Sequence, residues 1–301
     1  MSEKDAKKVD GCATFYKDNK YILLDKQLID ISNVAINRPD MKKEHDIFNR
    51  VMPRDNIAVV TFFENRLTGT RFLIVNAHIY YDAQYADVKV IQTAIIMEGV
   101  VKLAEKYARW PPCKDKKRIK LTEDRGLNPE VVEEPEIEPA PSMEYTSTQI
   151  PLIMCTDLNS LNDSGVYEFL ANGSIPSNHK DLASYSYGNF TRDGIQHPFA
   201  LRSAYANLDG TPDAVPYTNY TPGFTGVIDY IWYSTNALEA TELLGGADLD
   251  YMKRVPGWPT YHFPSDHLAL LAEFSVKPNR KEKKPQSHPE PDFGSQRDRR
   301  G

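Results

Sequence analysis

The chain has 301 residues, of which 41% are hydrophobic, and its 42 acidic and 36 basic residues give a formal net charge of −6. This length can bury a sizeable core, and the acidic balance argues against broad electrostatic capture of nucleic acid, which needs a basic face. The three separated cysteines (Cys12, Cys113 and Cys155) indicate neither a disulfide nor a zinc framework, and no apolar run approaches the length of a membrane span.

Six segments rich in β-branched and aromatic residues are predicted to be strands. They cover residues 21–24, 57–63, 72–77, 152–156, 227–233 and 268–276. Between residues 87 and 107 the apolar positions are spaced by three and four, which is typical of a helix. Runs of strands with helices between them predict two packed sheets flanked by helices.

Two segments have the composition of surface regions. Residues 111–150 begin with Pro-Pro, continue with a basic stretch and then an acidic, proline-bearing one, and are predicted to be a mobile insertion. Residues 277–301 hold eight basic and four acidic residues with almost no apolar ones, which predicts a disordered tail with a weak tendency to touch RNA. The expected organisation is one domain over residues 1–276, with the insertion inside it, followed by this tail.

Asp157 and Asn159 follow the apolar run 152–155, where a strand is expected to leave its sheet. Positions two apart in an extended chain lie on the same side, so the carboxylate and the amide would point to one place. A carboxylate there can orient or deprotonate a water, and the amide can donate to a phosphate oxygen. The alternative is a simple Asx turn at the end of the strand.

His267, in Ser265-Asp266-His267, lies at the entry of another predicted strand. A histidine can move a proton near pH 7 when a carboxylate fixes its tautomer. Asp229 is the natural partner, because a carboxylate within the apolar run 227–233 is costly unless it is paired or ligated. A polar turn around His267 and a purely structural pairing of Asp229 are the alternatives.

Asn76 and His78 end the predicted strand 72–77 with the same two-apart spacing. Asn76 is expected to brace the site and His78 to meet a phosphate oxygen, although a lone histidine is more often structural. Four such clusters at four strand ends indicate a phosphodiesterase site.

These clusters, together with the run Tyr-Thr-Pro-Gly-Phe-Thr-Gly-Val-Ile-Asp-Tyr-Ile-Trp at 220–232, resemble the endonuclease/exonuclease/phosphatase superfamily. Within it the chain looks most like the fungal poly(A) deadenylases of the carbon catabolite repressor type, over residues 2–276. The resemblance implies an α+β fold, the four-layer α/β/β/α sandwich of the DNase I-like type. It also implies a Mg²⁺-dependent 3′–5′ exoribonuclease with two ions, which removes poly(A) from mRNA and releases 5′-AMP. Such a protein is expected in the cytoplasm and nucleus as a subunit of the large deadenylase complex, with no membrane partner.

The resemblance also implies roles for individual residues. The implied catalytic residues are His78, Asp157, Asn159, Asp229 and His267. The implied substrate contacts are Asn76, Asn159 and Phe224, whose ring would stack on an adenine, and the implied metal ligands are Asp157 and Asp266.

Two family features do not occur in this chain: a Leu-Gln-Glu motif, whose glutamate is a principal Mg²⁺ ligand, and the leucine-rich repeats that dock a partner nuclease. The sequence therefore predicts a domain incomplete at its N-terminal side, with Met1 an internal methionine of the parent protein, and weak or no activity. The loop at 82–84 reads Asp-Ala-Gln where the family often has a proline, which leaves base contacts at that loop open. The alternatives are a disabled remnant that binds only RNA or a complex partner, and another phosphodiesterase or phosphatase of the superfamily.

Overall fold

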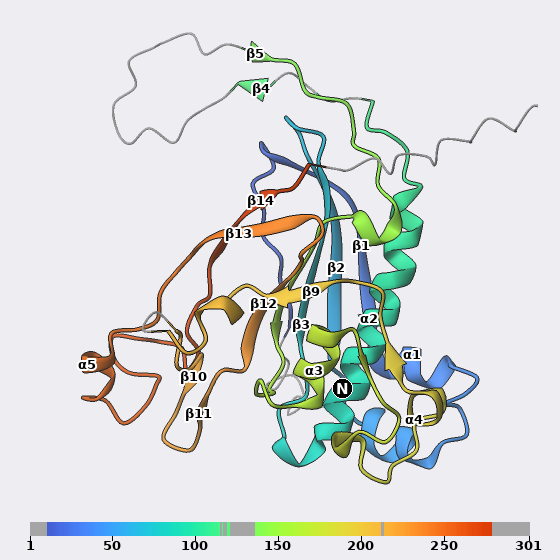
Figure 1. Ribbon diagram of the computed structural model, residues 1–301, viewed down its shortest axis with the longest axis vertical. Helices are drawn as coiled ribbons and strands as arrows, with labels where there is room; N and C mark the ends of the chain where they lie inside the picture. The colour runs from blue at the N-terminus through green and yellow to red at the C-terminus, as the bar shows by residue number, and fades with distance from the viewer. Residues whose placement is uncertain (1–10, 115, 117–118, 121–135, 212–213, 279–301) are drawn as a thin grey trace, which may run out of the picture.

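A mixed six-stranded sheet forms the centre of the computed structural model (Figure 1), which describes residues 11–114, 116, 119–120, 136–211 and 214–278. The strand order is β1-β2-β3-β6-β12-β9. The strands are β1 (Tyr21–Asp30), β2 (Ile57–Asn65), β3 (Arg71–His78), β6 (Leu152–Asp157), β9 (Leu201–Ser203) and β12 (Asp229–Ser234). β3 and β6 run parallel and the other neighbours antiparallel, so β3 and β6 end at the same edge of the sheet.

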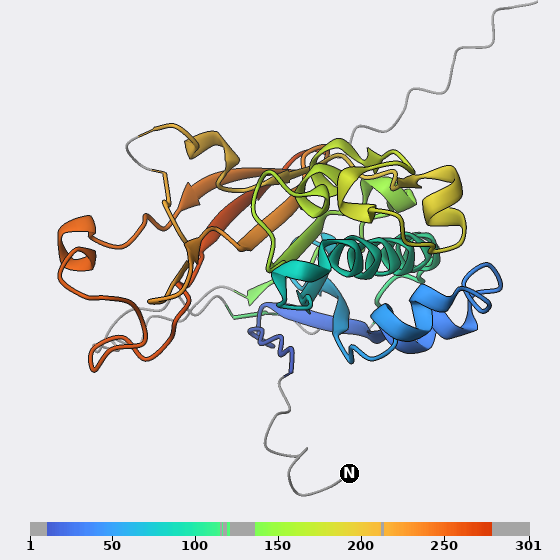
Figure 2. The ribbon, with the colours of Figure 1, turned by 90° about the horizontal axis from the view of Figure 1, so that it is seen from below.

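Helices cover one face of this sheet (Figure 2). The longest, α2 (Ala86–Ala108), confirms the helix predicted at 87–107 and packs its apolar side into the main core. It ends just before Pro111-Pro112, because a proline cannot continue the hydrogen-bond ladder. The other helices on this face are α1 (Ile31–Asn37), α3 (Gly165–Asn172) and α4 (Asn189–Asp193), with a π-helical turn at Ile47–Val51. The short helix α5 (Leu249–Met252) lies apart from them (Figure 1). None of the helices within the described ranges could cross a membrane.

A second, smaller apolar cluster lies against the far part of the sheet. It joins Ile231 and Tyr233 of β12 to the antiparallel pair β13 (Leu238–Leu243) and β14 (Ala272–Val276). The helix layer, the central sheet and this second sheet confirm the mixed α/β class. In the part of the chain that the structure describes, β13 and β14 are the strands of the second sheet.

Short elements complete the fold. The strands are β4 (Ile119–Lys120), β5 (Glu136–Ile137), β7 (Ser174–Ile175), β8 (Ile195–Gln196), β10 (Asn219–Tyr220) and β11 (Thr225–Gly226). The 3₁₀ turns are Ala83–Tyr85, Ser147–Gln149, Lys180–Leu182 and Ala206–Leu208.

Two strand predictions need correction. The strand expected at 21–24 continues to Asp30, because it pairs with β2 along its whole length. The strand expected at 268–276 begins only at Ala272, since Leu268 donates its backbone N–H to the carbonyl of Thr218 and so follows a different partner.

The predicted mobile insertion is fixed at both of its ends. Glu64 is fully buried and pairs with Arg71 Nε at 2.8 Å and with Lys116 Nζ at 2.5 Å. Arg71 also donates to the carbonyls of Trp110 and Pro111, and Ser142 Oγ donates to Glu64. Residues 110–111, Lys116 and Ser142 are therefore bound to the sheet by a buried ionic cluster. Part of the predicted insertion (residues 115, 117–118 and 121–135) lies outside the described residues. The same is true of residues 279–301, which make up most of the predicted tail.

Candidate active site

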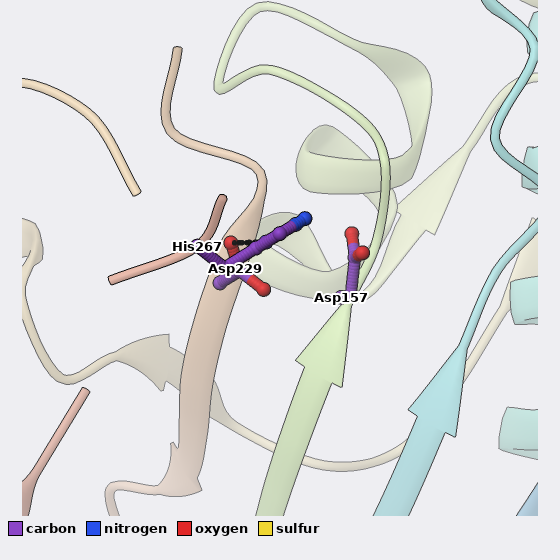
Figure 3. A group of neighbouring side chains, drawn as sticks. All are labelled: Asp157, Asp229 and His267. Carbon is purple, nitrogen blue, oxygen red and sulfur yellow. Dashed lines mark hydrogen bonds and ion pairs between the residues drawn. The ribbon is translucent and has the colours of Figure 1, made fainter. Parts of the chain in front are cut away.

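Strand geometry places three predicted site residues in one row. His78 is the last residue of β3 and lies opposite Asp157, the last residue of the parallel strand β6. Asp229, the first residue of the antiparallel strand β12, lies opposite Asp157 on the other side. The ends of these strands therefore form one edge of the sheet, as predicted. Asp157 lies at the middle of this edge (Figure 3).

The predicted pairing of Asp229 with His267 is confirmed. Nδ1 of His267 lies 2.8 Å from Oδ2 of Asp229. His267 reaches this position because its segment forms a bridge with Asn219, next to the start of β12. Thr218 Oγ1 accepts the backbone N–H of Asp229 at 3.0 Å and so holds the start of the strand.

Asn159 adopts a left-handed backbone conformation, with φ of 45°, which lets the chain turn sharply after β6. Its backbone N–H donates to Asp157 Oδ1 at 2.8 Å, so the Asx turn weighed above is present. The side-chain amide of Asn159 donates to the carbonyl of Ile79 at 2.9 Å and ties the ends of β3 and β6 together. A phosphate contact by Asn159 stays a prediction.

Three polar residues that were not predicted from the sequence brace this edge. Lys89 is buried on α2 and donates from Nζ to the carbonyl of Asn159 at 2.6 Å, and burial lowers the pKa of its ammonium group. Gln92 accepts the backbone N–H of Tyr80 and donates to Asn56, which in turn donates to the carbonyl of His78. The available signal was a lysine and a glutamine three residues apart, in the first half of α2, where nearly every side chain is buried.

Asp157 and His267 both have pKa values well above their ordinary ones. Burial and the charge of Asp229 raise the pKa of Asp157 to about 6, although the N–H of Asn159 works in the opposite direction. The hydrogen bond to Asp229 raises the pKa of His267 to about 9. At neutral pH the edge therefore holds a charged imidazolium beside Asp229 and an ionised Asp157 whose charge is poorly compensated.

This assignment predicts a pH dependence of stability. His267 has a folded-state pKa of about 9 against an ordinary value of 6.5, so its pairing contributes stability fully below pH 6.5. That contribution is lost as the pH rises through 9. We expect an NMR titration of the metal-free protein to give His267 a pKa near 9, and Asp229→Asn to bring it back toward 6.5. A His267 pKa that Asp229→Asn leaves unchanged would contradict the pairing.

The row also has the donor set of a cation site. Asp157 and Asp229 each offer a carboxylate oxygen, and these oxygens and a ring nitrogen of His267 all lie within 4.8 Å of one another. A bound cation would relieve the repulsion that raises the pKa of Asp157, and carboxylate oxygens suit hard divalent ions. The site thus fits a divalent metal ion.

Three further predicted residues lie around this row. Asp266 lies beside the cluster and accepts a 3.5 Å hydrogen bond from Asn219, so its role as a metal ligand stays a prediction. Asn76 donates to the carbonyl of Ala13 and thereby holds the start of the described chain against β3. Phe224 lies at the tip of the β10–β11 hairpin and is 42% exposed. Its ring lies close against Gly226, where an added Cβ atom would come within 2.9 Å of it.

Comparison with known proteins gives the relatives of the chain. No family model matches it. It is 56% identical over 284 residues to the CCR4-Not complex 3′-5′-exoribonuclease subunit Ccr4 of Neurospora crassa, an alignment that covers 94% of the chain and 36% of that protein. The subunit of the same name from Phaeosphaeria nodorum is 54% identical over 303 residues, or 99% of the chain and 49% of the relative. The chain thus spans between about a third and a half of the length of these curated relatives.

The fold has a solved counterpart. The crystal structure of ANGEL2, a 2′,3′-cyclic phosphatase, in complex with adenosine-2′,3′-vanadate matches with a TM-score of 0.56 at 20% identity, over 86% of this chain and 68% of that one. At this identity the match shows the fold alone, and it confirms the expected fold type.

Proposed function

We propose that this chain, a close homologue of part of the Ccr4 exoribonuclease subunits, carries the phosphodiester-cleaving centre of a divalent-metal-dependent 3′–5′ exoribonuclease. Its substrate would be the poly(A) tail of mRNA and its product 5′-AMP. The observation that carries the proposal is the row formed by Asp157, Asp229 and His267, in a chain more than half identical to proteins named for this activity.

The residues of the row divide the work between them. His267 is charged at neutral pH, and because Nδ1 faces Asp229, its Nε2–H can donate to a phosphoryl oxygen as negative charge develops there. Asp157, ionised above pH 6, can orient the attacking water. His78, whose Nε2 lies 3.5 Å from Asp157 Oδ2, is placed to contact the same phosphate.

Asp157 and Asp229 are the residues that would hold the metal, which we take to be Mg²⁺. When bound, such ions polarise the phosphodiester and neutralise charge on the attacking and leaving oxygens. Since the whole chain has a net charge of −6, the contact with RNA is expected to be local and to depend on these ions.

The relatives are named as subunits of the CCR4-Not complex, and we propose the same kind of assembly for this chain, acting in the cytoplasm and nucleus. A second candidate is a protein that binds RNA or a complex partner without cleaving RNA. The observation in its favour is that the described cluster contains two carboxylates, and the sequence has no Leu-Gln-Glu motif to add the expected glutamate.

The proposal is tested by incubating the purified chain with poly(A)-tailed RNA, with Mg²⁺ or with EDTA. Slow shortening of the tail that EDTA stops is the expected result, because the sequence predicts weak activity for this chain. Binding of the RNA without any shortening would favour the second candidate. Parallel incubations with abasic DNA and with a phosphoinositide separate a nuclease of this specificity from the other activities of the superfamily.

A further inference from the structure

A cluster of aromatic and cationic side chains lies beside the active site. The tyrosine–arginine platform consists of Tyr80, Tyr81, Tyr85 and Arg54. The ring of Tyr81 is 71% exposed and its centroid lies 5.1 Å from that of Tyr80, which in turn meets Tyr85 edge-on at 5.4 Å. A tyrosine this exposed contributes little to a core, so its ring is available to a ligand.

Arg54 supplies a charge to this platform. Its guanidinium lies 4.6 Å from the ring centre of Tyr80 and 4.7 Å from that of Tyr85. Its Nε is buried without a hydrogen-bond partner, and no carboxylate within the described residues forms an ion pair with it. The neighbouring Arg50 differs, because its Nε and Nη2 both donate to the carboxylate of Asp87. Arg54 is thus an uncompensated cation stacked between aromatic rings.

One nearby acidic side chain, Asp82, is turned to another partner. The carboxylate of Asp82 accepts the backbone N–H of Gln84 at 2.9 Å and begins the turn that leads into α2. It also interacts with the ammonium group of the buried Lys89. Asp82 therefore leaves the charge of Arg54 available.

The platform is fixed to the catalytic strand. Tyr81 follows His78 by three residues, so their Cα atoms are at most about 11 Å apart. The backbone of Tyr80 is hydrogen-bonded to Gln92 on α2, and Asn56, two residues after Arg54, donates to the carbonyl of His78. The position of the platform relative to the active site is therefore set by the fold.

The platform and Phe224 lie on opposite sides of Asp157. The platform follows β3 and Phe224 precedes β12, and these two strands are the neighbours of β6 on either side. Figure 1 shows the β10–β11 hairpin and the connection from β3 to α2 at the same end of the sheet. A strand of RNA with its scissile phosphate at Asp157 would meet one aromatic surface on each side.

We propose that the tyrosine–arginine platform binds single-stranded RNA on the 5′ side of the scissile phosphate, with a base stacked on Tyr81 and a phosphate near Arg54. This inference rests on the proposed function and adds a second subsite to it. Stacking of bases on aromatic rings is tolerant of sequence, and arginine adds a contact to the backbone. The subsite would hold the tail in place while the terminal nucleotide is removed.

The test is the affinity of the full chain for a 5′-fluorescein RNA of 20 adenosines, followed by anisotropy in an Asp157→Asn background that blocks hydrolysis. Tyr81→Ala should weaken binding by about 5- to 20-fold, and Tyr81→Phe should restore most of it. Arg54→Gln should weaken binding and reduce the salt dependence by about one phosphate contact. The loss caused by Tyr81→Ala should be larger for 20 adenosines than for 3.

Tyr16→Ala is the matched control. This residue is a tyrosine with 43% exposure, and it contacts Phe63 at the opposite end of the sheet. If Tyr81→Ala binds the long RNA as tightly as the Asp157→Asn background, or if Tyr16→Ala causes the same loss, the subsite is disproved while the proposed function stands. If the background protein does not bind oligoadenosine at all, the subsite and the proposed function fail together.

Discussion

Asp157→Asn should lower the hydrolysis of poly(A) RNA by about 10³-fold or more, because it removes a group that orients water and holds metal. The structure also predicts that this variant folds normally. Burial of Asp157, together with the neighbouring charge of Asp229, raises its pKa to about 6. An asparagine keeps the shape and removes the charge, so the unfolding midpoint near pH 7.5 should be equal to or above that of the original chain. Single-turnover hydrolysis and urea unfolding measure the two effects.

The control is Asp163→Asn, which alters an exposed aspartate in the connection that follows β6. It should leave both hydrolysis and the unfolding midpoint unchanged. A loss of activity in Asp157→Asn that came with an equal loss of stability would show that Asp157 acts in folding. Full activity in Asp157→Asn would remove it from the active site.

Glu64→Gln should destabilise the chain by about 3 to 5 kcal/mol, since it leaves two buried cations without their carboxylate. Glu64 is fully buried, and the side chains of Arg71 and Lys116 are only 5% and 7% exposed. Burial alone would raise the pKa of Glu64, but hydrogen bonds from Lys116, Arg71 and Ser142 outweigh it and lower this pKa. The stabilisation is therefore present above the ordinary pKa of a glutamate and is lost as the pH falls through the lowered one. Urea unfolding at pH 7 measures the change.

Asp250→Asn serves as the comparison for Glu64→Gln. It breaks an ion pair with Lys253 in which both side chains are about three-quarters exposed, and such pairs contribute little. Its unfolding midpoint should be that of the original chain. If Glu64→Gln behaved in the same way, the buried cluster would not be what holds the two ends of the insertion to the sheet.

The active site was more predictable from the sequence than the edges of the fold. The carboxylate of Asp229 stood out because the apolar strand around it makes a lone charge costly, and the structure pairs it with His267 as expected. The ends of the predicted strands similarly identified Asp157 and His78. The expectation that Asn159 continues the strand beside Asp157 was wrong, because the chain turns at Asn159 with φ of 45°.

The features that the sequence did not reveal depend on contacts between distant segments. Lys89 was hidden because its partner, the carbonyl of Asn159, lies 70 residues away, and a backbone acceptor leaves no mark in the sequence. The cluster around Glu64 joins the β2–β3 hairpin to both ends of the insertion for the same reason. The prediction that the domain is incomplete at its N-terminal side stays a prediction, as do the metal role of Asp266 and the stacking role of Phe224.

The central claim is that the row at Asp157, Asp229 and His267 cleaves the terminal phosphodiester of poly(A). The most direct measurement is a time course of 5′-labelled RNA of 20 adenosines with the purified chain and Mg²⁺, resolved at single nucleotides with identification of the released product. We expect a ladder that shortens by one nucleotide at a time from the 3′ end, with 5′-AMP as the product, and no ladder for Asp157→Asn. RNA that is bound but remains at 20 nucleotides, or a ladder that persists in Asp157→Asn, would contradict it.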